Sequence, residues 1–171
     1  MGKWDKGIDY MFAYNKILKH MARAKPPALC YDAILLIQLR NGSRVSEAVR
    51  AFLEFLNTKS LELEVRVSKK RNKNIMRLMV IPQELIKLNI VSQCFGLRNV
   101  EEKKLINRVK NYCIYTYEYG SHNHRYAFIN EALRRGIDAL TIAEITKQSK
   151  ADIILRYVQK KRAEETLKDF S

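Results

Sequence analysis

The sequence is poor in the residues that interrupt folded structure, with six glycines and three prolines among 171 residues. This scarcity excludes a long flexible linker, and we find no internal repeat and no low-complexity tract. No apolar run reaches the roughly 18 residues of a transmembrane helix, and no basic amphipathic helix with an exposed aromatic face is evident. The length suits one domain of ordinary size, or one domain with a short appendage.

Cysteine is also scarce. Cys30, Cys94 and Cys113 are far apart in the sequence and form no C-x-x-C pair, so the ligand spacing of a metal site is absent. We expect all three to be reduced, small apolar residues of an intracellular protein. The segment from Gly2 to Asp9 is polar and charged, whereas a secretory signal needs an apolar core.

Acidic residues are few relative to basic ones, because 18 Asp and Glu stand against 32 Lys and Arg, which gives a net charge of +14. Such an excess on a small domain predicts a polyanionic partner. An anionic membrane is the alternative, but the missing apolar and amphipathic segments count against it. We therefore expect nucleic acid as the partner and no membrane association.

Hydrophobic periodicity predicts a mostly helical chain of the α+β class, built around one small antiparallel sheet. Apolar residues at every second position from Leu61 to Val67 predict a half-buried strand. A returning strand is expected from Ile75 to Ile81, after a turn at residues 71–74. Helices are expected over residues 10–24, 28–39, 43–56, 84–89, 101–119, 122–135, 138–146 and 151–167.

Two arginines lie at predicted helix starts. Gly42 suits a left-handed helix end, Ser43 is expected to cap the next helix, and Arg44 then lies in its first turn. His122 and Arg125 are three positions apart and share one face of a later helix. Helix N-termini favour a phosphate, and a planar guanidinium matches two phosphate oxygens. The pair of arginines therefore predicts a site for a phosphodiester.

Each of these residues has an ordinary alternative role when it is considered alone. An arginine near a helix start is usually solvated, a histidine is more often a surface or capping residue, and a lysine-rich turn is often only a polar hairpin tip. Tyr157 has little claim by itself among nine tyrosines. The functional interpretation depends on the order and spacing of the whole set.

Four segments follow one another in a fixed order: Gly-Ser-Arg-Val-Ser-Glu at 42–47, Lys-Lys-Arg-Asn-Lys at 69–73 leading to Met-Val-Ile-Pro at 79–82, His-Asn-His-Arg at 122–125, and Arg-Tyr at 156–157. In this order they resemble the first arginine box, the lysine hairpin, the H-x-x-R box and the nucleophile segment of the tyrosine recombinases. This family comprises site-specific integrases of the phage and archaeal type. The resemblance implies the fold of the DNA breaking–rejoining enzymes, a helical catalytic core with one small antiparallel sheet.

The resemblance assigns a role to each member of the expected catalytic set, which is Arg44, Lys70, His122, Arg125, Gln148 and Tyr157. Tyr157 is the expected nucleophile, which attacks the scissile phosphorus and forms a 3′-phosphotyrosine. Arg44 and Arg125 stabilise the charge that develops on the nonbridging oxygens. Lys70 protonates the leaving 5′ oxygen, and His122 takes the tyrosine proton or binds a phosphate oxygen.

The sequence departs from the family pattern shortly before the nucleophile, where the family usually has Gly-His and this chain has Lys147 and Gln148. A glutamine can donate a hydrogen bond to a phosphate oxygen but cannot titrate. The hairpin register also leaves Lys69 and Lys73 as alternatives to Lys70. The residues expected to contact DNA are Lys69, Arg71, Lys73, His124, Lys147 and Lys150.

The resemblance spans roughly residues 28–158 and suggests two parts, an N-terminal helical arm at 1–27 and a catalytic domain with a C-terminal tail at 28–171. The 27 residues before Ala28 are too few for the separate core-binding domain that family members normally have. In the family such a tail can dock on a neighbouring subunit, and Leu167 and Phe170 are apolar anchors for this. We therefore expect double-stranded DNA as the partner and self-association on it, as a dimer or tetramer.

The resulting hypothesis is metal-independent cleavage and rejoining of DNA in site-specific recombination or integration, inside the host cell of an archaeal or viral mobile element. No cofactor and no metal are expected, since the sequence offers no acidic cluster to hold Mg²⁺. Two alternatives stay open. One is a type IB topoisomerase-like relaxing enzyme, and the other is a DNA-binding module on the same fold with weakened catalysis.

Overall fold

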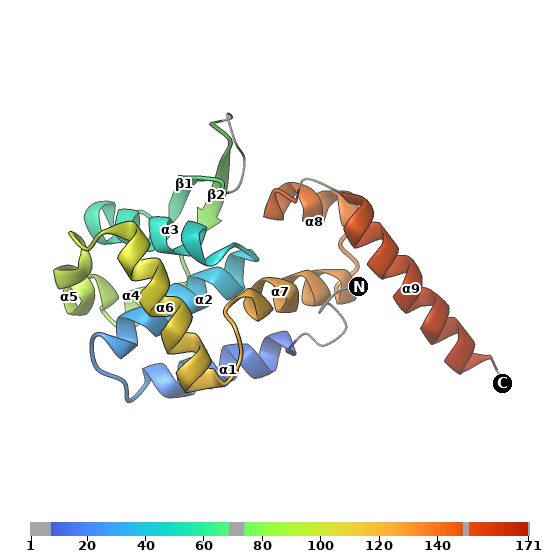
Figure 1. The fold of residues 1–171 in the computed structure, drawn as a ribbon, viewed down its shortest axis with the longest axis horizontal. Helices are drawn as coiled ribbons and strands as arrows, with labels where there is room; N and C mark the ends of the chain where they lie inside the picture. Colours follow the sequence, from blue (N-terminus) through green and yellow to red (C-terminus); the bar gives the residue numbers. More distant parts are fainter. Residues whose placement is uncertain (1–7, 69–73, 149–150, 171) are drawn as a thin grey trace.

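Helix α2 (Ala28–Asn41) is the central element, because its apolar residues leave almost no polar face. Helices α1 (Tyr10–Met21), α3 (Val45–Thr58), α6 (Glu102–Tyr117) and α7 (His122–Arg134) pack around it, as Figure 1 shows for this computed structural model. The structure describes residues 8–68, 74–148 and 151–170.

One two-stranded sheet lies against α3 and α2. Strands β1 (Glu62–Arg66) and β2 (Met76–Val80) pair antiparallel, with Leu63 opposite Met79 and Val65 opposite Arg77. The short helices α4 (Glu84–Lys87) and α5 (Ile90–Cys94) and the 3-10 helix η2 (Phe95–Leu97) follow, and α8 (Ala139–Thr146) and α9 (Ala151–Asp169) complete the chain. The predicted fold class, mostly α with one small antiparallel sheet, is confirmed.

The predicted helices and strands are present with ends that differ by a few residues. The largest difference is in α1, which ends at Met21 and not near residue 24. Helices α5 and η2 were not predicted, since five and three residues are too few to show a helical period. Residues 71–73 of the turn predicted at 71–74 lie outside the described residues.

Helix α1 belongs to the same core as α2. Ala13, Ile17 and Met21 are buried in the main hydrophobic cluster. The Tyr14 hydroxyl donates to Glu84 at 2.5 Å, and the His20 ring nitrogen Nδ1 lies 2.6 Å from a carboxylate oxygen of the buried Asp32 on α2. The N-terminal segment is thus packed on the rest of the fold from Tyr10 onward.

The C-terminal end of α2 fixes the edge of the sheet. The Asn41 side chain donates to the carbonyl of Val80 at 2.8 Å and accepts from its N–H at 2.8 Å, which reproduces the pairing of a neighbouring strand. The same amide donates to the carbonyl of Ile37 at 2.9 Å. The Asn41 side chain therefore ties the end of β2 to the end of α2.

Gly42 ends α2 in the left-handed conformation, with φ 58°, as predicted. A β-carbon at this position would lie 2.2 Å from the ring of Phe128 on α7. Glycine is needed both for the backbone conformation and for the close approach of α7. The turn at Gly42 consequently brings the start of α3 beside α7.

The cysteines do not match the expectation that all three are reduced. Cys30 on α2 and Cys94 on α5 form a disulfide, although they are 64 positions apart, and Cys113 is buried and free. The error has a physical reason, because the two sulfurs meet only when the unpredicted helix α5 packs against α2. Helical periodicity holds no information about that contact.

Helices α8 and α9 form a second, smaller core with α7, which includes Ile129, Ile142 and Ile154. Figure 1 shows α9 extending away from the body of the molecule beyond this contact. Leu167 and Phe170, near its end, are exposed. No helix in the described part of the chain is long and apolar enough to cross a membrane.

Candidate active site

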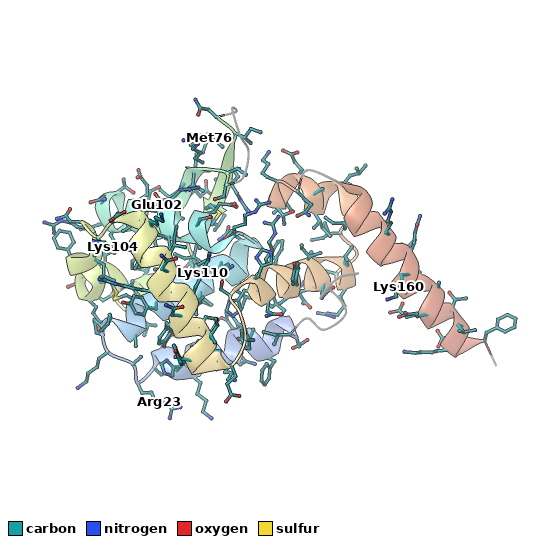
Figure 2. All side chains as sticks on the ribbon, in the orientation of Figure 1. Arg23, Met76, Glu102, Lys104, Lys110 and Lys160 are labelled. Atoms are coloured by element: carbon teal, nitrogen blue, oxygen red, sulfur yellow. A yellow bond between two sulfur atoms is a disulfide. The ribbon has the colours of Figure 1, made fainter. Side chains whose placement is uncertain are left out.

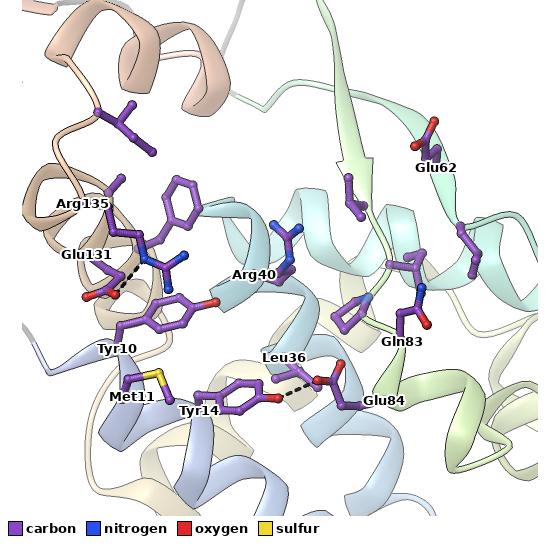
Figure 3. A pocket seen from close by; sticks show the side chains of 17 residues that line it. Tyr10, Met11, Tyr14, Leu36, Arg40, Glu62, Gln83, Glu84, Glu131 and Arg135 are labelled. Carbon is purple, nitrogen blue, oxygen red and sulfur yellow. Dashed lines mark hydrogen bonds and ion pairs between the residues drawn. The ribbon is translucent and has the colours of Figure 1, made fainter.

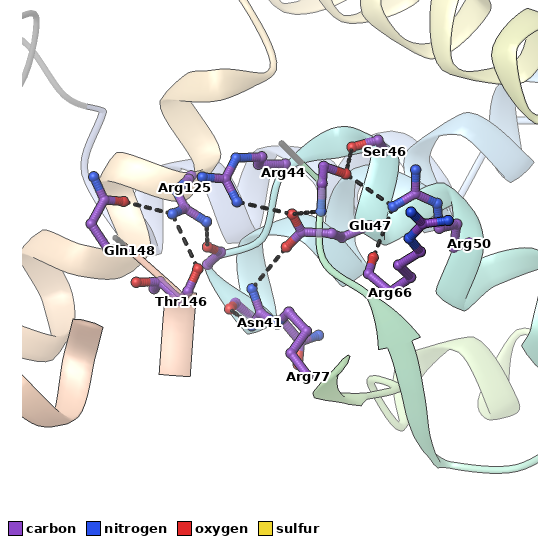
Figure 4. A network of polar contacts seen from close by, with 12 residues as sticks. Asn41, Arg44, Ser46, Glu47, Arg50, Arg66, Arg77, Arg125, Thr146 and Gln148 are labelled. Carbon is purple, nitrogen blue, oxygen red and sulfur yellow. Dashed lines mark hydrogen bonds and ion pairs between the residues drawn. The ribbon is translucent and has the colours of Figure 1, made fainter. Parts of the chain in front are cut away.

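The carboxylate of Glu47 is the centre of a buried polar network at the start of α3 (Figure 4). Glu47 has no exposed surface. Its Oε2 accepts from Arg44 at 3.1 Å and from the backbone N–H of Ser68 at 3.4 Å, and its Oε1 accepts from Arg77 at 3.1 Å. One carboxylate thus binds the residue that caps α3, a residue that follows β1 and a residue of β2.

Arg77 is a member of this network that the sequence analysis missed. Its side chain points inward from β2 and also donates to the carbonyl of Asn41 at 2.7 Å. Burial lowers the pKa of its guanidinium below the usual range. Its position in the sequence could have indicated this burial. Arg77 is two and four residues before the buried Met79 and Ile81, and alternate residues of a strand lie on the same face.

Arg44 is not in the first turn of α3, as was expected, but at the N-cap position, with extended backbone angles of φ −74° and ψ 154°. The expected cap, Ser43, is fully buried. Burial of Ser43 under the neighbouring elements leaves its side chain unable to serve as the cap, and α3 begins one residue later than predicted. Arg44 therefore leaves the backbone before the helix begins, and 18% of its side chain is exposed.

Arg125 lies on α7 and is 2% exposed. Its guanidinium donates to the carbonyl of Gly42 at 2.9 Å, to the carbonyl of Thr146 at 3.1 Å and to the Gln148 side-chain oxygen at 2.7 Å. Burial, and after it the positive charge of Arg44, lower its pKa to about 10. The group is still charged at neutral pH.

The network holds more positive than negative charge. Arg44 lowers the pKa of both Arg77 and Arg125, Arg77 also lowers that of Arg125, and Glu47 is the carboxylate that offsets them. An anion beside Arg44 would relieve this imbalance, and a guanidinium is suited to two phosphate oxygens. The geometry therefore favours a phosphate group as the ligand.

Gln148 is brought to Arg125 by the end of α8. Lys147 has φ 52° in the left-handed region, which reverses the chain after Thr146. Since the Gln148 oxygen accepts from Arg125, its amide nitrogen is the group that can donate to a ligand. Lys147, an expected DNA contact, forms an ion pair with Glu144 through its Nζ.

The two histidines of the H-x-x-R box have different surroundings. His122 is exposed at the start of α7, with its ring edge-on to Tyr126 at a centroid distance of 5.0 Å. His124 has no exposed surface, packs edge-on against Tyr119, and lies with Nε2 3.2 Å from the Tyr119 hydroxyl. Burial lowers its pKa to about 3.

This burial does not fit the DNA contact expected of His124, and we correct its role to a neutral residue of the core. The physical reason is helical geometry, since positions 124 and 125 turn inward with α7 while position 122 turns outward. Polar residues at a helix start do not reveal which of them the neighbouring helices cover.

The structure thus brings Arg44, Arg125 and Gln148 together, with Glu47 and Arg77 as additional members. Tyr157 is on α9, but its side chain is outside the part that the structure describes. Also outside the described residues are Lys69, Lys70, Arg71, Lys73 and Lys150. Among the described residues, no group of three or more His, Cys, Asp or Glu could hold a metal ion.

A separate cavity of about 710 Å³ lies between α1, α2, α7 and the end of β2 (Figure 3). Its lining shares no residue with the arginine network. Arg40 and Arg135 line it together with the carboxylates of Glu84 and Glu131. Because the charges are mixed, this cavity favours no anionic ligand, and the arginine network is the better phosphate site.

Comparison with known proteins gives relatives that match nearly the whole chain. "Putative integrase ORF241" of Acidianus two-tailed virus is 32% identical over 171 residues, which cover 98% of this chain and 68% of the relative. "Putative integrase V10" of Sputnik virophage is 28% identical, covering 95% of this chain and 88% of the relative. "Uncharacterized protein MJ0770" of Methanocaldococcus jannaschii is 28% identical, covering 98% and 89%. No family model and no solved structure matches the chain.

Proposed function

We propose that this chain acts on DNA in integration or recombination, because it belongs to the same family as "Putative integrase ORF241" of Acidianus two-tailed virus. The name of the Sputnik virophage relative supports the same role. The net charge of +14 agrees with a DNA partner, because each phosphate contact needs a cation.

We propose further that the reaction is the transesterification of a tyrosine recombinase. The observation that supports this most is the pair Arg44 and Arg125. Arg44 binds Glu47, Arg125 binds the carbonyl of Gly42 two residues earlier in the chain, and the charge of Arg44 lowers the pKa of Arg125. Two guanidinium groups beside each other suit the nonbridging oxygens of one phosphodiester, whose charge increases in the transition state.

In the proposed reaction the Tyr157 hydroxyl attacks the scissile phosphorus and the bond from phosphorus to the 5′ oxygen breaks. Gln148, held by Arg125, donates its amide N–H to a phosphate oxygen. His122 accepts the tyrosine proton, and a lysine of the 69–73 segment supplies the proton of the leaving oxygen. The bond energy is kept in the 3′-phosphotyrosine, so rejoining needs no nucleotide.

A nicked suicide duplex tests this proposal. Cleavage releases a short fragment that carries the free 5′ hydroxyl, and once this fragment is lost the strand cannot be rejoined, so that covalent protein–DNA adduct accumulates. We expect adduct with the natural sequence, also in excess EDTA, and none with Tyr157→Phe. Tyr115→Phe is the matched control, since Tyr115 is an exposed tyrosine on α6, and it should form adduct normally.

The outcomes separate the competing functions. Adduct that maps to a tyrosine other than Tyr157 would contradict the assignment of the nucleophile. DNA binding without any adduct would favour a DNA-binding module on this fold. Adduct together with relaxation of supercoiled DNA, but without strand exchange between two duplexes, would favour a relaxing enzyme of the type IB topoisomerase kind.

A further inference from the structure

A second hydrogen-bond network lies beside Glu47, where α3 meets the end of β1 (Figure 4). The Ser46 and Ser68 hydroxyls are 2.5 Å apart, and the Arg50 guanidinium donates to the Ser68 hydroxyl at 3.0 Å. Arg50 also donates to the carbonyl of Arg66 at 2.8 Å. Side chains of α3 therefore hold the last residues of β1 directly.

Ser68 is at the point where the pairing of the two strands stops. The last backbone hydrogen bond described between them runs from the Val67 N–H to the Ile75 carbonyl at 2.8 Å. The next residue, Ser68, is bound through its backbone N–H to Glu47 and through its hydroxyl to Ser46 and Arg50. Its position is thus set by α3 and not by the partner strand.

Arg50 is itself held in place from the other side. Its Nε donates to Glu102, the first residue of α6, at 2.7 Å. A long side chain that is fixed at both ends of its guanidinium loses little further freedom when it binds Ser68. The end of β1 is consequently tied to α3 and, through Arg50, to α6.

The same carboxylate oxygen, Oε2 of Glu47, accepts from both Arg44 and the Ser68 N–H. A displacement of Ser68 therefore changes the surroundings of the carboxylate that orients Arg44. The distance between the arginine network and the end of β1 is fixed through this shared atom.

We propose that Ser46 and Arg50 hold Ser68 beside the arginine network, and that all three are positioning residues because proton donation to the leaving oxygen depends on this placement of Ser68. This inference rests on the proposed function, in which a lysine following Ser68 is the donor. None of the three touches the reacting atoms. They act through the donor, whose misplacement by about 1 Å can cost on the order of 10²-fold in rate.

The chemistry of the leaving group separates positioning from a structural role. In cleavage the bond from the Tyr157 oxygen to phosphorus forms, the bond from phosphorus to the 5′ oxygen breaks, and a proton passes from the lysine ammonium to that oxygen. When sulfur replaces the bridging 5′ oxygen, a thiolate leaves with the electron pair and needs no proton, because a thiol is far more acidic than an alcohol. A defect in proton donation is thus absent with the sulfur substrate.

The experiment compares adduct formation by Ser68→Ala on two suicide duplexes that differ only in this bridging atom. We expect a loss of about 10- to 100-fold on the oxygen substrate and no more than about a twofold loss on the sulfur substrate. The substitution removes no charge, so DNA affinity should be unchanged. Ser60→Ala is the matched control, since the Ser60 hydroxyl binds the Glu62 carbonyl at the other end of β1, and it should affect neither substrate.

Two further variants test whether the residues act together. Ser46→Ala combined with Ser68→Ala should be no slower than Ser68→Ala alone, because the two hydroxyls form one interaction. Arg50→Lys keeps the charge but loses the planar fork, and should show the same preference for the sulfur substrate.

Equal losses on both substrates by Ser68→Ala would overturn the proposal in favour of a structural role, and so would normal cleavage of the oxygen substrate. Failure of the proposed function appears differently, because the natural sequence would then form no adduct with either substrate.

Discussion

Arg44 and Arg125 differ in how much of their hydrogen bonding the protein itself uses. The Arg125 guanidinium donates hydrogen bonds to the carbonyls of Gly42 and Thr146. The Arg44 side chain, in the described contacts, binds only Glu47 and is partly exposed. A lysine keeps the charge at either position but not the planar fork. The roles of the two residues can therefore be distinguished by measuring, for a variant at each position, both the rate of cleavage and the free energy of unfolding.

We expect Arg44→Lys and Arg125→Lys each to slow adduct formation on the order of 10²-fold, as for the loss of one oxyanion donor. Only Arg125→Lys should also lower the free energy of unfolding, because it leaves buried carbonyls without a donor. Single-turnover cleavage and urea unfolding measure the two effects. Arg134→Lys, an exposed arginine of α7, is the control, and near-normal cleavage by both test variants would contradict the phosphate clamp.

His124 should make stability depend on pH. Burial lowers its pKa to about 3 in the folded state, while the unfolded value is the ordinary 6.5. Between these values the unfolded chain binds a proton that the folded chain does not. The free energy of unfolding should therefore decrease as pH falls below about 6.5, by up to about 1.4 kcal/mol per pH unit, and this contribution levels off near pH 3.

Urea unfolding of the natural sequence and of His124→Gln, between about pH 7.5 and about pH 4.5, measures this contribution, since the variant lacks the titrating ring. Other acid-titrating groups affect both proteins alike and cancel in the difference. A pH dependence that is the same in both would show that His124 is not buried as a neutral ring.

At the scale of elements, the disulfide joins α5 to the central helix α2. We expect Cys30→Ser, or reduction of the natural protein, to lower the free energy of unfolding by about 2 to 4 kcal/mol, because the unfolded chain regains the freedom of a long loop. Denaturant unfolding with and without reductant measures the change. Cys30→Ser should not respond to reductant, and an unresponsive natural protein would contradict the disulfide.

The elements that could be predicted from the sequence are those whose own pattern defines them. The central helix α2 has apolar residues on nearly all sides, and β1 alternates strictly, so both are recognisable locally. The contact of α5 with α2 and the inward position of Arg77 depend on packing between distant segments. The order of the sequence boxes named Arg44, Arg125 and Gln148, which lie together in the structure, but it did not show that Glu47 binds both Arg44 and Arg77.

For the whole molecule, the net charge of +14 is distributed over several elements. Figure 2 shows Lys104 and Lys110 on α6, Arg23 after α1 and Lys160 on α9, all at the surface. A cationic surface of this extent releases counterions when it binds DNA. The affinity should therefore be set mainly by phosphate contacts and depend weakly on base sequence.

We expect the logarithm of the DNA association constant to fall linearly with the logarithm of salt concentration. Each phosphate contact should contribute roughly −0.9 to the slope of this plot. Titrations between about 50 mM and about 200 mM salt measure the slope. The variants Lys104→Gln and Lys110→Gln should each reduce the slope by about 0.9 when that lysine touches a phosphate. An affinity that stays constant over this range would remove the electrostatic basis of the DNA partner.

The turn at Gly42 has a consequence for how this protein can change in the course of evolution. One short peptide segment supplies the acceptor of Arg125 and, two residues later, the backbone of Arg44. The distance between the guanidinium groups of Arg44 and Arg125 therefore depends on the backbone of residues 42–44. The segment around Gly42 can therefore change little, since a side chain at Gly42 would clash with the ring of Phe128 on α7.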